Sequence, residues 1–205
     1  MKTMMKGLLI VLVVAALPLG ASAQQLFDFN GQALLPAGVG GQLTMYSVMF
    51  DPAPIDSPIP LDFANYEFTL VLEGATLTVD GISRIFAGGT VTIYQDAATS
   101  ADYANPATFT DGTAILVGNL TSLSQFVPPV GPGSASGHLD WVGGTRLTDM
   151  APDDQLNWTF VSGTNANSGT LEPGYDEVWD GKTEPPSTIV DTEAASMSKV
   201  KALFK

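Results

Sequence analysis

Apolar and polar residues alternate along most of the chain. The alternation covers Leu26 to Phe29, Leu43 to Phe50, Tyr66 to Leu72 and Val91 to Ile93, and it continues after Asp111 in AILVG, LTSLSQFV, GHLDWVGG and LNWTFVSG. Successive side chains of a strand point to opposite faces of its sheet, so this period indicates strands with one buried face. Turn sequences rich in Gly, Pro, Asp and Asn separate the segments. The pattern predicts an all-β domain of about nine to ten strands.

The same pattern predicts how the strands pack. Strands with one apolar face are stable when two sheets stack on each other, and the region from Gln24 to Gly181 has no long stretch of helical spacing. We therefore expect an antiparallel β-sandwich or jelly roll. A short helix is expected only at the C-terminus, after a linker of Pro and Thr residues.

One strand segment contains a change of register. In YEFTLVLEGATLTVDG the apolar residues Phe68, Leu70 and Leu72 share one parity, and those that follow Gly74 share the other. Either a bulge or a tight hairpin must lie between Glu73 and Gly74. We favour a bulge in one long strand, because the Asp-Gly pair just downstream is the better hairpin turn.

The ends of the chain differ from its body. Residues 1–23 combine two lysines, the apolar run GLLIVLVVAAL and a final ASA, which is typical of a signal peptide. We expect a β-domain over 24–181, a linker over 182–191 and an amphipathic basic tail over 192–205. The predicted location is therefore secreted, either extracellular or on the cell surface, with the periplasm as the alternative.

Charge and composition exclude several classes of partner. Two of the eight basic residues lie in the signal peptide, so the rest of the chain carries six basic residues against 21 acidic ones, a net charge of about −15. Nucleic acid and anionic membrane surfaces repel such a chain. No segment after the signal peptide is apolar and long enough to cross a bilayer. The chain has no cysteine, so the domain must be stable without disulfides.

Groups for catalysis are few, and we predict that the protein is not an enzyme. His138 is the single histidine, and the nearby GSASG has Ala135 where a nucleophile elbow needs serine. The segment LEPGYDEVWDG carries paired carboxylates at Glu172, Asp176, Glu177 and Asp180, which a glycoside hydrolase could use. Strand spacing would point Glu177 away from Asp176 and Asp180, so we interpret this segment as a solvated loop.

A structural calcium is the one cofactor that the composition favours. Calcium takes carboxylate and carbonyl oxygens from loops, and aspartate is abundant here. The candidate ligands are Asp149, Asp153, Asp154, Asp176 and Asp180. None of the aspartate clusters has the spacing of an EF-hand, and aspartate is also an ordinary turn residue.

Aromatic residues suggest a polysaccharide site. Trp141 and Trp158 lie within alternating strands and are expected in the core. Trp179 lies among polar residues together with Tyr175, so these two rings are the candidates for stacking on a sugar.

Two stretches carry weak resemblances. The segment GTVTIYQDAATSADYANPATFTDGTAILVGNL, from Gly89 to Leu120, resembles uncharacterised secreted bacterial β-domain proteins of the PEP-CTERM-associated type, although this chain has no PEP-CTERM anchor. The end SMSKVKALFK is similar to terminal stretches of the form S-W-x-x-V-K-x-L-F/Y-R/K on exported bacterial proteins. The resemblance implies a sorting or docking tail, with contacts from Val200, Lys201, Leu203 and Phe204.

These observations lead to one main hypothesis and two alternatives. We expect a non-catalytic structural or adhesive protein, secreted or at the cell surface, whose partner is a surface component or a polysaccharide. The first alternative is a carbohydrate-binding module, stabilised by calcium. The second is a jelly-roll glycoside hydrolase, which needs two carboxylates facing each other across a groove.

Overall fold

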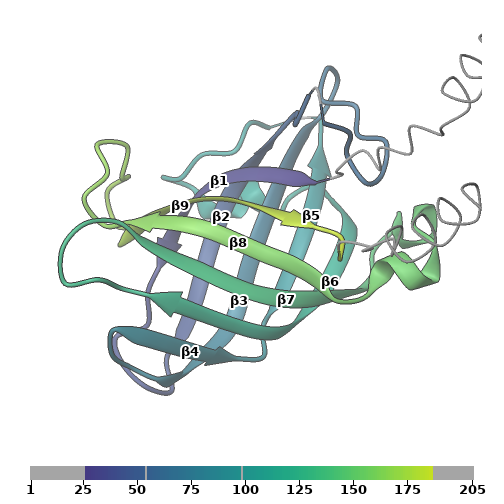
Figure 1. Cartoon of the computed structure of the whole chain (residues 1–205). Helices are drawn as coiled ribbons and strands as arrows, with labels where there is room; N and C mark the ends of the chain where they lie inside the picture. Colours follow the sequence, from purple (N-terminus) through teal and green to yellow (C-terminus); the bar gives the residue numbers. More distant parts are fainter. Residues whose placement is uncertain (1–25, 54, 98, 187–205) are drawn as a thin grey trace, which may run out of the picture.

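The computed structural model describes residues 26–53, 55–97 and 99–186, and the described chain is almost entirely antiparallel β-structure (Figure 1). Three short 3-10 helices lie in the loops: η1 (Pro106–Phe109), η2 (Leu147–Asp149) and η3 (Pro152–Gln155). The nine strands are β1 (Phe27–Leu34), β2 (Gln42–Phe50), β3 (Glu67–Val79), β4 (Ser83–Ala87), β5 (Thr90–Asp96), β6 (Thr113–Phe126), β7 (Gly133–Gly143), β8 (Trp158–Asn165) and β9 (Glu177–Glu184). The prediction of an all-β domain with about nine strands is confirmed.

The strands close into a barrel of eight positions, so the expected sandwich or jelly roll is wrong. Consecutive strands pair with each other except β4 and β5, and β9 returns to pair with β1. Strands β4 and β5 follow each other in the same position, because both pair with β3 on one side and with β6 on the other. Alternating apolar and polar residues indicate only that each strand has one buried face. Both a sandwich and a barrel bury one face of each strand, so the pattern does not distinguish them.

The last strand was not expected from the sequence. LEPGYDEVWDG was interpreted as a loop and Lys182 as the start of a linker, but β9 runs from Glu177 to Glu184. Its inward residues are Glu177, Trp179, Gly181 and Thr183, which pair with inward residues of β1 or β8. Only one of these four is a large apolar side chain, so the strand lacks the usual alternation.

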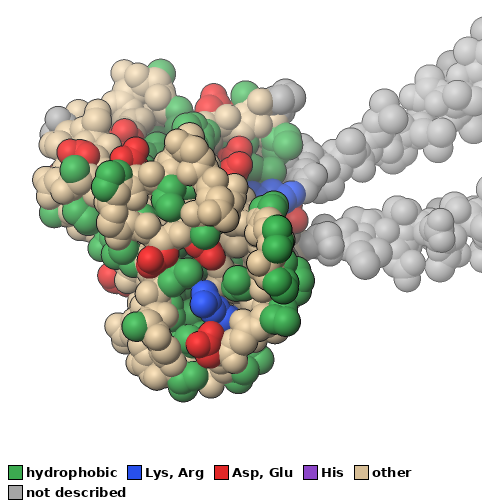
Figure 2. Space-filling view, turned by 90° about the vertical axis from the view of Figure 1, so that its left-hand side faces the viewer, with side chains coloured by type: hydrophobic (Ala, Val, Ile, Leu, Met, Phe, Trp, Pro, Cys, Tyr) green, Lys and Arg blue, Asp and Glu red, His purple; other side chains and the backbone are tan. Residues whose placement is uncertain are grey.

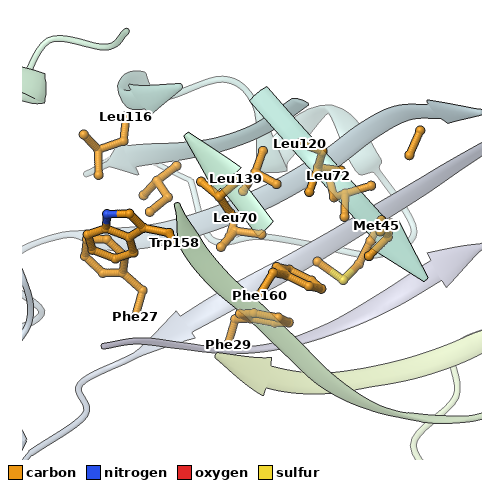
Figure 3. Packing of buried hydrophobic residues seen from close by; sticks show 14 of the residues in the cluster. Phe27, Phe29, Met45, Leu70, Leu72, Leu116, Leu120, Leu139, Trp158 and Phe160 are labelled. Atoms are coloured by element: carbon orange, nitrogen blue, oxygen red, sulfur yellow. The ribbon is translucent and has the colours of Figure 1, made fainter. Parts of the chain in front are cut away.

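Aromatic pairs fill much of the barrel interior (Figure 3). The ring of Phe27 stacks on Trp158 with centroids 5.6 Å apart, and Phe29 stacks on Phe160 at 5.3 Å. Trp141 meets Trp158 edge to face at 5.7 Å, and all five side chains are almost completely buried. Stacked and edge-to-face rings each contribute about 0.5–1.5 kcal/mol beyond their buried area.

The two ends of the barrel differ. The covered end carries the loop 51–66 and helices η2 and η3, with Ile59 fully buried and Phe63 packed on Phe68 at 5.0 Å. Arg146, just before η2, connects this helix to the loop 51–66, because its Nη1 donates to the carbonyl of Pro60 at 2.7 Å. The opposite end, here called the open end, is formed by the loops 35–41, 80–82, 127–132 and 166–176. In Figure 1 the last two of these loops lie at the left.

The first and last described strands meet at the covered end. Phe27, the first residue of β1, pairs with Thr183 near the end of β9. The expected signal peptide (1–23), the expected helix and the expected docking residues Val200, Lys201, Leu203 and Phe204 lie outside the described residues, as does most of the linker. None of the helices in the described ranges has the length and apolar character needed to cross a membrane.

The predicted bulge in β3 is confirmed. Strand β3 is continuous from Glu67 to Val79, and its pairing with β2 shifts between Leu43, opposite Ala75, and Met45, opposite Leu72. Gly74 has a φ of +74°, in the left-handed region that favours glycine. The bulge allows Leu72 and Ala75 both to face the core.

Replacing Gly74 by alanine tests this conformation. A Cβ at Gly74 would have only the Cα of Gly89 within 4 Å, at 3.8 Å, so it meets no clash. The expected loss is therefore the conformational cost alone, about 1–2 kcal/mol of unfolding free energy. Urea denaturation measures it, with Gly169→Ala as the control, because a Cβ there meets nothing within 4 Å and its φ is not positive. Equal stability of the two variants would contradict the assignment.

Candidate functional site

Polar side chains occupy the barrel interior near the open end. Arg84 on β4 lies directly opposite Gln125 on β6, and both point inward, because Gln125 in turn faces the buried Ala135. Glu177 on β9 and Thr164 on β8 complete the group. Gln125, Thr164 and Glu177 are 1%, 3% and 5% exposed. A carboxylate and an amide are thus enclosed in a barrel whose other buried polar side chains at inward positions, Ser47, Ser162 and Thr183, carry only hydroxyl groups.

Two hydrogen bonds hold the Glu177 carboxylate. Gln125 Nε2 donates to Glu177 Oε2 at 2.6 Å, and Trp179 Nε1 donates to the same oxygen at 3.1 Å. Trp179 is on β9 with Glu177 itself, whereas Gln125 is on β6, so the Gln125 bond joins two strands that do not pair with each other. Since both bonds end on Oε2, Oε1 is left for a further donor.

Burial raises the pKa of Glu177 above its ordinary value. The hydrogen bonds from Trp179 and Gln125 and the positive charge of Arg84 oppose this rise, while the nearby Asp176 adds to it. No lysine or arginine of the described chain makes an ion pair with this carboxylate. The charged form is therefore only partly compensated by the protein.

Two polar atoms of the network have no partner among the described residues. They are Arg84 Nη1 and Gln125 Oε1, both buried. The other side of the Arg84 guanidinium is satisfied, because Nε donates to Asp80 Oδ1 at 3.2 Å. A buried polar atom without a partner costs about 1–3 kcal/mol, so such atoms mark places where water or a ligand completes the structure.

A cavity of about 240 Å³ adjoins the network at the open end. Its walls include Glu177 and Thr164 from the barrel interior and Val127, Pro128 and Pro129 from the loop between β6 and β7. Figure 2 shows this side of the molecule, where apolar groups lie between red carboxylates and blue atoms are few. The arrangement can bind a small molecule, with apolar contact from the loop and Glu177 in the wall.

The two predicted sugar-binding rings are not together. Trp179 is fully buried in the barrel, so the expectation of an exposed ring is wrong. The polar neighbours Asp180 and Lys182 face the other side of β9, and Glu177 is itself buried beside Trp179, so a polar sequence context does not indicate exposure here. Tyr175 lies outside the barrel, where its hydroxyl donates to the carbonyl of Tyr103 at 3.1 Å and its ring meets Tyr46 edge to face. It joins the loop 166–176 to the loop 97–112.

The aspartates predicted as calcium ligands lie in separate parts of the structure. Asp149 pairs with Arg146 at 2.8 Å, close in the sequence to Asp153 and Asp154 on η3. Asp176 accepts a hydrogen bond from the backbone of Leu35 at 2.7 Å, and Asp180 lies exposed on β9. Within the described ranges, no three His, Cys, Asp or Glu residues are grouped so that they could hold a metal ion. A structural calcium stays a prediction.

The residues considered for catalysis are also separated. His138 is exposed on the outer face of β7, where its Nδ1 lies 3.2 Å from Ser122 Oγ, and GSASG is part of that extended strand. Glu177 faces the interior while Asp176 and Asp180 are exposed, as the strand spacing predicted. The absence of catalysis stays a prediction.

Sequence reasoning missed Arg84 and Gln125, although a signal was present. Arg84 lies two residues before Phe86, and Gln125 lies two residues after Leu123, so both polar residues occupy core positions of alternating strands. A polar residue at such a position needs a buried partner. The alternation identifies the positions, but the partner, Glu177, follows only from the closed barrel.

Comparison with known proteins adds no relative. No protein-family model, no curated protein and no solved structure matches the chain. The resemblance of Gly89 to Leu120 to secreted bacterial β-domains therefore stays a prediction.

Replacing Glu177 by glutamine tests the burial of its charge. Because the pKa of Glu177 is raised in the folded protein, this residue favours folding fully below its unfolded pKa, about 4.3, and that contribution is lost as the pH rises through the folded value. We expect the stability of the wild type relative to E177Q to fall between pH 4 and pH 8, with E177Q at least as stable at pH 7. Thermal unfolding at several pH values measures this.

Asp111→Asn is the matched control, since it removes the same charge from an exposed loop position. A stability difference between the wild type and E177Q that does not change with pH would show that Glu177 is not a buried charge.

Proposed function

We propose that this protein is a non-catalytic secreted or cell-surface protein, attached through its C-terminal segment, whose acidic barrel presents the open end to its surroundings. The observation that carries the proposal is the pairing of Phe27 with Thr183. Because the chain enters and leaves the barrel at the covered end, attachment through the C-terminal segment would leave the open end accessible. The cavity beside Glu177 then lies on the accessible side.

The distribution of charge supports the same arrangement. The described cations Arg84, Arg146 and Lys182 each form an ion pair with a carboxylate, at 3.2, 2.8 and 2.7 Å. Most carboxylates of the barrel therefore have no cation beside them. In the sequence, three further lysines are grouped at positions 199, 201 and 205. A basic segment on an acidic barrel is suited to an anionic surface component, which the barrel itself would repel.

Deletion of residues Thr192 to Lys205 tests the attachment. We expect the truncated protein to move from the surface fraction to the medium when the cells that produce it are fractionated. The deletion spares every described strand, so the barrel should keep its thermal stability, and that measurement serves as the control for folding. A second variant, with Lys199, Lys201 and Lys205 changed to glutamine, separates the charges from the apolar contacts. Unchanged surface retention of the truncated protein would overturn the proposal.

A further inference from the structure

We propose that the cavity at the open end binds a small organic cation, a primary amine with a short apolar body, and that Glu177 pairs with its ammonium group. This inference deepens the proposed function and rests on it only for the accessibility of the open end. Three features of the described residues support it: the position of Glu177 in the cavity wall, the incomplete compensation of its charge and the apolar loop that forms one wall.

The network lacks a donor. Glu177 Oε2 already accepts from Gln125 and Trp179, whereas Oε1 accepts from no described residue. Gln125, which is 1% exposed, has its Oε1 buried without a partner. The Gln125 amide cannot reverse without turning this oxygen toward the Glu177 carboxylate. Of these two residues only Glu177 forms part of the cavity wall, so a ligand that pairs with it there must donate hydrogen bonds, and an ammonium group supplies three donors.

Charge favours a cation over a neutral donor. Glu177 is a carboxylate in a buried position without an ion pair, and its charged form is stabilised when a positive group comes within about 4–6 Å. The surrounding barrel is acidic, which raises the local concentration of cations.

The positive charge of Arg84 would by itself favour an anionic ligand. Its Nη1 is buried without a partner, but its Nε is paired with Asp80, which compensates its charge. Arg84 and Gln125 are both absent from the walls of the cavity, whereas Glu177 forms part of them. The charged residue that a ligand meets in the cavity is therefore Glu177.

The size and walls of the cavity limit the body of the ligand. About 240 Å³ is less than the ~300–1,000 Å³ of pockets for drug-sized molecules. Val127, Pro128 and Pro129 offer apolar contact, while Thr164 and Asn167 add polar groups. A short alkyl chain or a single ring with one ammonium group fits this description.

Titration calorimetry of the purified protein with cyclohexylamine tests the proposal, with cyclohexanol and cyclohexanecarboxylate as the neutral and anionic counterparts. We expect binding of the amine at pH 7 and at least tenfold weaker binding of the other two. E177Q should lose affinity for the amine by about 30-fold or more, as expected when one partner of a buried charge pair is removed. Asp111→Asn, with the same change in net charge, should retain it within about twofold.

A spectroscopic readout on the wild type makes the test independent of how E177Q folds. Trp179 Nε1 donates to Glu177, whereas Trp158 Nε1 donates to the carbonyl of Asp154 at the covered end. Binding of the amine should shift the indole N–H resonance of Trp179 and leave that of Trp158 unchanged, with each signal assigned by a Trp→Phe variant. The protein truncated at Thr192 should bind equally well, so failure of the tail and failure of the site are separate results.

Three outcomes would overturn the inference. They are no binding of the amine, binding that E177Q leaves unchanged, and stronger binding of the carboxylate that Arg84→Gln abolishes. The last outcome would assign the cavity to anions instead.

Discussion

The pairing of β1 with β9 is the constraint on which the rest of the structure depends. It runs from Phe27 opposite Thr183 to Ala33 opposite Glu177 and joins the two ends of the described chain. Without it, β1 and β9 would be edge strands with unpaired backbone groups, which invite association with other chains. With it, the strands enclose the interior, the two ends of the described chain lie at one end of the barrel, and Glu177 and Trp179 are placed inside.

Closure also determines how the interior is divided. A barrel of eight strands has room for little more than its own side chains. Near the covered end, the stacked and almost completely buried rings of Phe27 and Trp158 fill the interior. Near the open end, several inward positions are small, including Ala33 and Gly133. At this end Gln125 Nε2 on β6 donates to Glu177 Oε2 on β9 at 2.6 Å.

The sequence predicts the strands better than it predicts their arrangement. Alternation identifies most strands and the bulge at Gly74, because both depend on local spacing. Closure depends instead on a contact between residues more than 140 positions apart, and a period of two is equally compatible with a sandwich. The polar residues around Trp179 predict an exposed ring for a related reason: Asp180 and Lys182 do face outward, but Glu177 is buried beside the ring in the closed barrel. The candidate site could be anticipated only as polar residues at core positions.

The polar network is more consistent with binding than with stability. Replacing buried charged groups by apolar residues of similar volume is often neutral or stabilising by 1–4 kcal/mol, so stability alone does not explain Glu177. Gln125 and Trp179 fix the orientation of its carboxylate but leave one oxygen and one amide oxygen without donors. A network that served only specific packing would be expected to satisfy all its members. Trp141 Nε1 and Thr183 Oγ1, nearer the covered end, are also buried without a partner, so unsatisfied atoms alone do not mark the site. What distinguishes the open end is that Glu177, a buried carboxylate without an ion pair, also forms part of the wall of a cavity.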